Sequence, residues 1–177
     1  MNHYTATYNS PLGSIVIESD GEALTGLRFS NEQACVASTT QEKAPNEAAT
    51  ALPIILETIQ WLDDYFAGRQ TENAIIGAKT DGRITVRPRG TMFQQRVLQA
   101  LLTIPYGKTV SYGEIARMVD CRSAQAVGQA VGRNPIALII PCHRVIAAND
   151  QLGGYAYGIE LKRHLLEWER RHSPTQH

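Results

Sequence analysis

The sequence is poor in cysteine and has no long apolar run. Its three cysteines, Cys35, Cys121 and Cys142, are far apart. An odd, widely spaced set argues against a disulfide framework and against a cysteine-rich zinc site. No apolar stretch approaches the roughly 20 residues that span a bilayer. The opening residues lack a basic segment followed by an apolar one, so no secretory signal is predicted and we expect a cytoplasmic protein.

The 177 residues carry no net charge, yet the charges are unevenly distributed. Residues 1–82 contain four basic and eleven acidic side chains, whereas residues 83–177 contain thirteen basic and six acidic ones. A basic half beside an acidic half suggests that the C-terminal part meets an anion, with nucleic acid as the obvious candidate. Two solvated faces with chance segregation of charge are the alternative, and charge alone leaves both open.

The N-terminal half predicts a small sheet and one helix. Two strands are expected around the turn Asp20-Gly21, because Ile15 and Ile17 alternate with polar neighbours and an apolar segment follows the turn. Residues 52–66 carry apolar side chains at helical spacing, which predicts an amphipathic helix.

The boundary between two domains is expected near the middle of the chain. Residues 31–50 predict a loop and a poorly determined helix, and residues 71–89 look extended and irregular. We therefore place an N-terminal α/β domain at residues 1–82, a linker at 83–89 and a C-terminal domain at 90–177.

The C-terminal half predicts helices, three of which follow a hydroxyl side chain that can cap them: residues 92–103 after Thr91, 112–119 after Ser111 and about 124–132 after Ser123. The last two, across a tight turn, resemble a helix-turn-helix, a pattern that many helical domains share. The second of them, AQAVGQAVG, has unusually small side chains, which suit either close helix packing or close approach to a ligand. A final amphipathic helix is expected over residues 159–171.

A thiol, an imidazole and a guanidinium follow one another after a buried-type segment. Residues 136–140, IALII, predict a short apolar strand that ends just before Cys142. A nearby base or cation lowers a thiol pKa from about 8.5 and makes it reactive. His143 is the candidate base, although strand neighbours point to opposite sides, so contact needs a bend or a bridging water. Glu169 is the best candidate to orient that base. A structural, unreactive Cys142 remains the alternative.

The segment IIPCHRVI, preceded by GRNP and followed by LGGY and LKRHLLEWE, closely resembles the O6-alkylguanine-DNA alkyltransferase family. The segments IPYGKTVSYGEIA and GTMFQQRVLQALL are also similar to that family, and the match is dense over residues 90–171. In the N-terminal half, SPLGSIVI, LTGLRF and LDDYFAG support it more weakly. The resemblance implies an α/β (α+β) fold with an RNase H-like sheet-plus-helix domain first. The resemblance also implies that a mostly helical, winged-helix-like domain, which binds DNA and carries the catalytic residues, follows the first domain in the chain.

The resemblance also implies a reaction. An alkylated guanine is flipped out of double-stranded DNA, which is bound through its minor groove, and Cys142 takes the alkyl group in one irreversible turnover. O4-alkylthymine is a further expected substrate. His143 would deprotonate Cys142 through a water, polarised by Glu169. No metal and no organic cofactor is expected. The protein is expected to act as a monomer, with cooperative binding along DNA left open.

Other family positions carry over one by one. Tyr112 matches the tyrosine that assists base flipping and can protonate the leaving guanine. Asn134 matches an asparagine that braces the turn between the recognition helix and the active-site segment. Val145 falls where a backbone carbonyl reads the guanine amino group, and Tyr155 where an aromatic ring lines the pocket. Ala156 falls where many relatives have Ser, so a contact to the guanine oxygen there would come from a backbone N–H.

Two positions depart from the family pattern. Relatives usually have an arginine where this chain has Gln125, and that arginine fills the stack vacated by the flipped base. Gln is shorter and lacks cationic stacking, so either Gln125 fills the gap less well or Arg122 substitutes for it. Tyr157 stands where some relatives have Gly and should narrow the pocket. The remaining residues expected at the DNA or substrate are Ser123, Ala126, Gly128 and Arg133.

Two other functions are weighed against alkyl transfer. A lesion-sensing DNA-binding protein without catalysis is the first, but such proteins replace the nucleophile, and Cys142 is present here. A cysteine hydrolase using Cys142 and His143 is the second, and it would turn over. The zinc of some members' N-terminal domains is not expected, because Cys35 and His3 are the only plausible ligands in that half of the sequence.

Overall fold

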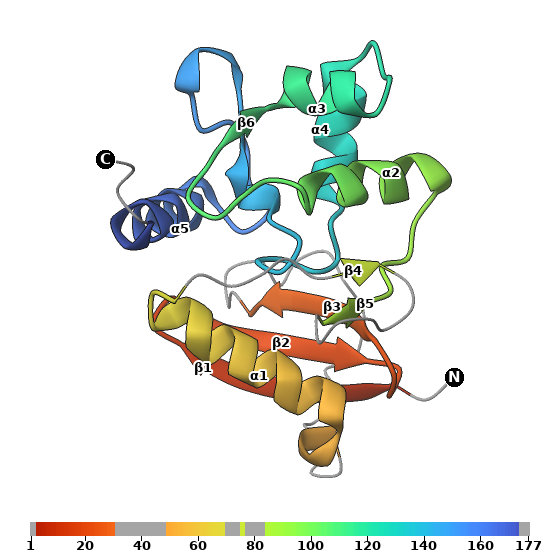
Figure 1. The fold of residues 1–177 in the computed structure, drawn as a ribbon, viewed down its shortest axis with the longest axis vertical. Helices are drawn as coiled ribbons and strands as arrows, with labels where there is room; N and C mark the ends of the chain where they lie inside the picture. Colours follow the sequence, from red (N-terminus) through yellow and green to blue (C-terminus); the bar gives the residue numbers. More distant parts are fainter. Residues whose placement is uncertain (1–2, 31–48, 70–74, 77–83, 174–177) are drawn as a thin grey trace.

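The computed structural model describes residues 3–30, 49–69, 75–76 and 84–173. Its N-terminal part is a five-stranded sheet covered by one helix, α1 (Pro53–Phe66), which lies across β1 and β2 (Figure 1). The order is β1-β2-β3-β5-β4; the first three strands are antiparallel, and β5 runs parallel to β3 and β4. The strands are β1 (Tyr4–Ser10), β2 (Gly13–Ser19), β3 (Leu24–Phe29), β4 (Ile75–Ile76) and β5 (Thr85–Val86).

The two strands predicted around Asp20 and Gly21 are confirmed as β2 and β3, and the predicted amphipathic helix is confirmed as α1. The N-cap residue of α1 is Leu52, whose side chain cannot accept a hydrogen bond, and the proline that follows presets the helical φ angle. β1 was not predicted from the sequence. The loop and helix expected over residues 31–50 lie almost wholly outside the described residues, apart from the start of η1 (Ala49–Ala51).

The C-terminal part is mostly helical, as predicted. It contains α2 (Met92–Leu101), β6 (Val110–Ser111), α3 (Tyr112–Met118), α4 (Ala124–Gly132), η2 (Cys142–Arg144), β7 (Val145–Ile146), η3 (Ala148–Asp150) and α5 (Ile159–His172). All three predicted caps form: Thr91 and Ser111 make full capping boxes with the residue three positions on, and the Ser123 side chain accepts from the Ala126 N–H. The short strands β6 and β7 pair in parallel.

The strand predicted over residues 136–140 is wrong. Ile136 makes a single bridge to Leu27, after which the chain turns, with Leu138 at φ 64° and the Ile140 N–H donating back to the Ile136 carbonyl. All five side chains are nevertheless buried. A short apolar run shows that a segment is buried, but it does not distinguish a strand from a buried turn.

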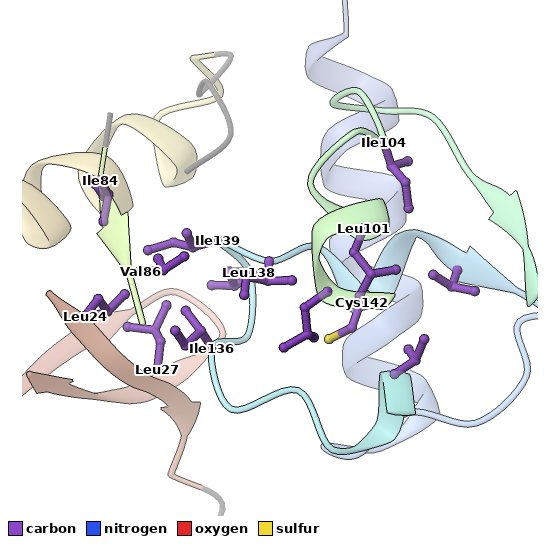
Figure 2. Packing of buried hydrophobic residues seen from close by; sticks show 14 of the residues in the cluster. Leu24, Leu27, Ile84, Val86, Leu101, Ile104, Ile136, Leu138, Ile139 and Cys142 are labelled. Atoms are coloured by element: carbon purple, nitrogen blue, oxygen red, sulfur yellow. The ribbon is translucent and has the colours of Figure 1, made fainter. Parts of the chain in front are cut away.

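This buried turn joins the two parts of the molecule. The Leu27 N–H donates to the Pro135 carbonyl at 2.9 Å, and the Ala137 N–H donates to the Leu27 carbonyl at 2.8 Å. Figure 2 shows Ile136 among the sheet residues, with Leu138 between that group and the helical part near Cys142. The core is therefore continuous from the sheet to the residues around the thiol.

The segment predicted as a linker, residues 83–89, contains β5. Val86 pairs with Leu24 of β3, and the Arg87 N–H donates to the Leu24 carbonyl at 2.8 Å.

In the described part of the chain, no helix is long and apolar enough to cross a membrane.

Candidate active site

Cys142, His143 and Arg144 form the single 3₁₀ turn η2, directly after the buried turn. Sequence reasoning placed Cys142 at the end of a strand, where His143 would point the opposite way. In a 3₁₀ turn successive side chains are instead rotated by about a third of a turn around the helix axis, so Cys142 and His143 do not point to opposite sides. All three side chains are buried, so any charge they carry needs a partner inside the protein.

That partner is Glu169 on α5, as the sequence predicted for His143. Glu169 Oε1 lies 2.7 Å from His143 Nε2, and both side chains are fully buried. If Nε2 carries the proton and donates to the carboxylate, Nδ1 is the nitrogen left free to accept one. His143 Nδ1 is buried and has no hydrogen-bond partner among the described residues. The ring is therefore oriented as a proton acceptor.

Glu169 has further donors that the sequence did not reveal. Arg144 binds it in two places, through Nε to Oε2 at 2.8 Å and through Nη2 to Oε1 at 3.0 Å. The Gly107 N–H donates to Oε2 at 3.0 Å, and the Tyr65 hydroxyl of α1 donates to Oε1 at 3.0 Å. Gly107 has φ 72°, and an added Cβ would collide with the Ser173 side chain, so this position requires glycine.

The pKa values suit a proton acceptor and a protected thiol. Burial lowers the pKa of His143, although Glu169 partly opposes that, so the ring is neutral at pH 7. Burial by itself would raise the pKa of Glu169, but the His143 and Arg144 side chains more than offset it and hold the pKa well below its usual range. Burial raises the pKa of Cys142, so the resting thiol keeps its proton until a base removes it.

A cavity of about 210 Å³ opens beside Cys142. Its lining contains seven residues that the sequence predicted for the site, together with Val131, Gly132 and Gly154. The seven are Tyr112, Gly128, Asn134, Cys142, Tyr155, Ala156 and Tyr157. The Tyr155 hydroxyl lies near the thiol, where it favours the thiolate and so opposes part of the rise in the Cys142 pKa. Residues from α3, α4 and the loop before α5 are thus brought to one thiol.

Asn134 braces the turn, as expected. Its side-chain amide donates to the carbonyls of Ile136 at 3.2 Å and Ile140 at 2.8 Å, while its Oδ1 accepts from the Ile136 N–H at 3.0 Å. These bonds fix the backbone just before Cys142. A non-glycine residue at positive φ, such as Leu138, costs of order 1–3 kcal/mol and persists only where neighbours hold it.

Lys162 of α5 is another residue that sequence reasoning missed. It is fully buried, and its Nζ donates to the carbonyl oxygens of Val145 at 2.6 Å and Gly154 at 3.2 Å. Burial lowers its pKa to about 8, and the nearby Cys142 partly opposes that shift. The signal was present in the segment LKRHLLEWE, where a lysine occupies the inward face of an amphipathic helix.

The other predicted residues lie around this centre. Val145 is buried in β7 and outside the cavity lining, and its carbonyl already accepts from Lys162. Arg122, Ser123 and Gln125 are exposed at the start of α4, and Arg133 is exposed at the end of this helix. Ala126 is half-buried.

Among the described residues, no group of three or more His, Cys, Asp or Glu side chains could hold a metal ion. His3 is exposed, and Cys35 lies outside the described residues.

Both halves of the chain match one family. Residues 92–171 match the 6-O-methylguanine DNA methyltransferase DNA binding domain, and residues 3–76 match the ribonuclease-like domain of the same family. A methylated-DNA–protein-cysteine methyltransferase of Mycobacterium tuberculosis is 43% identical over 176 residues, covering 99% of this chain and 96% of the relative. The chain belongs to the 6-O-methylguanine DNA methyltransferase family. A Haemophilus influenzae relative with the same name is 37% identical, covering 94% and 86% of the two chains.

Solved structures of the 6-O-methylguanine DNA methyltransferase family share the fold. The crystal structure of Mycobacterium tuberculosis O6-methylguanine methyltransferase has a TM-score of 0.76 at 41% identity and covers 99% of this chain and 97% of its own. The structure of the Mycobacterium tuberculosis protein in complex with DNA has a TM-score of 0.78 at 42% identity, with 97% and 96% coverage. The expected mixed α/β fold, with a sheet first and a helical part second, is confirmed.

Proposed function

We propose that this chain repairs alkylated DNA directly, by irreversible transfer of a methyl or other alkyl group from O6-alkylguanine to Cys142. The observation that carries the proposal is the thiol at a cavity of about 210 Å³, next to a neutral histidine bound to a buried carboxylate. Membership of the methyltransferase family supports the same reaction.

The chemistry balances without a cofactor. His143 Nδ1 accepts the Cys142 proton through a bridging water, and the thiolate attacks the alkyl carbon. The new S–C bond forms as the C–O6 bond breaks, and the electron pair goes to the guanine oxygen. Tyr112, at the cavity wall, is the candidate proton donor to the leaving base, and the proton held by His143 restores the balance. A thioether does not hydrolyse, so each molecule acts once.

Access to the alkyl group requires the base to leave the duplex, which costs a few kcal/mol. In this proposal the exposed start of α4 meets the DNA minor groove with Gln125 or Arg122, and the flipped base enters the cavity beside Gly128. The Ala156 backbone is one candidate reader of the guanine edge. The Val145 carbonyl is the other, through the lone pair that does not accept from Lys162. We propose O4-alkylthymine as a second substrate, a monomer as the acting form and the cytoplasm as its location. We also propose that residues 1–82 and 90–177 are the two domains.

The test is the intact mass of the protein after incubation with duplex DNA containing O6-methylguanine. We expect a gain of one methyl group per molecule, mapped to Cys142, and no further turnover. Cys142→Ala should bind the same DNA and gain nothing, while Cys121→Ala, a half-buried cysteine outside the cavity lining, is the matched control and should react normally. Binding without a mass gain in the wild type would indicate a lesion sensor, and continuous release of a hydrolysed product would indicate a cysteine hydrolase.

A further inference from the structure

The hydrogen bonds around Glu169 include one from the sheet-bearing N-terminal half. Tyr65 lies near the end of α1, 104 positions before Glu169, and its hydroxyl donates to Glu169 Oε1 at 3.0 Å. The same oxygen lies 2.7 Å from His143 Nε2. Because both hydrogen bonds end on one atom, the Tyr65 hydroxyl acts directly on the carboxylate that orients the proton acceptor.

The Tyr65 side chain has little freedom to leave this position. It is fully buried, its ring stacks on Trp61 with centroids 5.4 Å apart, and it meets Tyr106 edge-on at 5.9 Å. Its backbone carbonyl accepts from the indole N–H of Trp168 at 3.1 Å, and Trp168 precedes Glu169 on α5. One residue therefore ties α1 to α5 through both its backbone and its hydroxyl.

We propose that Tyr65 is a positioning residue for the reaction of Cys142, through which the N-terminal half sets the reactivity of the thiol. The Tyr65 hydroxyl fixes the Glu169 carboxylate and shares its negative charge, and Glu169 in turn fixes His143. The inference rests on the proposed function for its substrate, but the thiol reactivity that it concerns is measurable without DNA.

Removing the hydroxyl has two expected effects. The carboxylate loses one of its restraints, so His143 is held less well and Cys142 reacts more slowly. The charge of Glu169 is also shared with one donor fewer, so it stabilises protonated His143 more strongly, and the acid limb of the pH–rate profile moves to higher pH. The charged and titratable groups that face Glu169 and His143 are Tyr65 from α1, Tyr106 from the loop before β6, Arg144 from η2, and Lys162 from α5.

The experiment measures how fast iodoacetamide alkylates Cys142 in the free protein as a function of pH, with peptide mass spectrometry to separate Cys142 from the other cysteines. Tyr65→Phe keeps the ring and removes only the hydroxyl. We expect the plateau rate to fall about three- to tenfold, which corresponds to roughly 0.7–1.4 kcal/mol, and the acid limb to shift upward. A plateau and a limb equal to those of the wild type would overturn the proposal.

Tyr8→Phe is the matched control. The Tyr8 hydroxyl also donates to a carboxylate of α1, Asp63 Oδ1 at 2.8 Å, and its ring stacks on Phe66, but this pair is exposed and does not reach the site. Tyr8→Phe should leave both features of the profile unchanged. A shift of the same size in both variants would point to a general effect of loosening α1 and would sink the positioning role.

Site-specific 3-fluorotyrosine at position 65 keeps the hydroxyl and tests the proposal even where Tyr65→Phe does not fold. Its more acidic hydroxyl withdraws more charge from Glu169, so the acid limb should move to lower pH, and an unmoved limb would contradict the inference. Single-turnover methyl transfer from O6-methylguanine DNA is measured in parallel. Wild-type protein that reacts with iodoacetamide but never with this DNA refutes the proposed function alone. Wild-type transfer to which Tyr65→Phe makes no difference refutes the positioning role alone.

Discussion

At the scale of single residues, one carboxylate organises the site. Glu169 accepts from Tyr65, Gly107 and His143 and from two nitrogens of Arg144, all within 2.7–3.0 Å. A buried carboxylate without such donors would be strongly destabilising. Glu169 therefore has a structural role beside its role toward His143, and a substitution there should affect stability as well as rate.

Glu169→Gln should slow alkyl transfer by roughly a hundredfold or more, because His143 loses the charge that orients it and stabilises its protonated form. It should also lower the free energy of unfolding by about 3–5 kcal/mol, because Arg144 is left buried without a counter-charge. Single-turnover rates and urea unfolding measure the two effects.

Glu167→Gln is the matched control for Glu169→Gln. Glu167 lies on the same helix and makes a partly exposed ion pair with Arg171 at 3.6 Å. Its substitution should change stability by less than about 0.5 kcal/mol and leave the rate unchanged. A Glu169→Gln protein as stable and as fast as this control would contradict both roles.

The pH dependence of transfer follows from the lowered pKa of His143. A proton acceptor works only in its neutral form, and lowering the pKa extends the neutral form to lower pH. The acid limb of the single-turnover rate should therefore lie below pH 6.5, the ordinary value for histidine. Rates measured between pH 5 and 8 on DNA that is itself stable over that range check this, and a limb above pH 6.5 would be inconsistent with a His143 buried in its neutral form.

At the scale of elements, α4 has two functions along its nine residues. Ser123 and Gln125 are exposed where the helix begins, while Val127, Ala130 and Val131 are buried against the core. Its two glycines, Gly128 and Gly132, line the cavity. The small side chains noticed in the sequence thus serve both alternatives, close packing on one face and an open cavity on another.

Gln125→Arg should tighten DNA binding or speed repair by roughly 2- to 30-fold. An arginine inserted into the vacated stack adds about 0.5–2 kcal/mol of cation–π attraction, and its charge steepens the salt dependence slightly. Gln129→Arg is the matched control, since Gln129 is an exposed glutamine one turn further along the same helix. Gln129→Arg should steepen the salt dependence of DNA binding slightly without adding cation–π attraction in the vacated stack.

Arg122 is the competing candidate for the inserted side chain. Single-turnover rates for Gln125→Ala and Arg122→Ala on double- and single-stranded DNA distinguish the two. If Gln125→Arg changes nothing, and Arg122→Ala abolishes repair of the duplex alone, Arg122 fills the stack and the assignment to Gln125 is wrong.

At the scale of the whole molecule, the sheet and the helical part share one core. The cluster of buried apolar residues runs from β1 through the buried turn to α5, and the backbone of Leu27 is hydrogen-bonded on both sides to that turn. Two parts joined in this way should unfold together, although the sequence predicts two domains.

We therefore expect a single cooperative unfolding transition. Tryptophan fluorescence reports Trp61 in α1 and Trp168 in α5, and its urea midpoint should coincide with that of far-ultraviolet circular dichroism. Leu27→Ala, at the junction, should lower the free energy of unfolding by about 2–5 kcal/mol without splitting the transition. Leu56→Ala, at a side chain that is 53% exposed on α1, is the control and should cost less than about 0.5 kcal/mol. Two separated transitions in the wild type would show that the parts fold independently.

The sequence by itself determined the features that depend on neighbouring residues. The caps at Thr91, Ser111 and Ser123 were predictable because a hydroxyl side chain bonds to a backbone N–H three residues away. The pairing of His143 with Glu169 was also predicted, but that prediction came from the family resemblance and from the rule that a catalytic base works better beside a group that orients it. The turn at residues 136–140 was not, because an apolar run specifies burial and leaves the backbone path to the surrounding core.

Only the tertiary structure decided which other residues surround Glu169. Tyr65, Gly107 and Arg144 reach it from 104, 62 and 25 positions away, and no local pattern encodes such distances. The same holds for β5, which looked like a linker because two residues are too few to show an alternating pattern, and which becomes a strand by pairing with β3. A nucleophile and its base can be recognised from adjacent letters, whereas a buried charge is satisfied by whichever donors the packed chain brings to it.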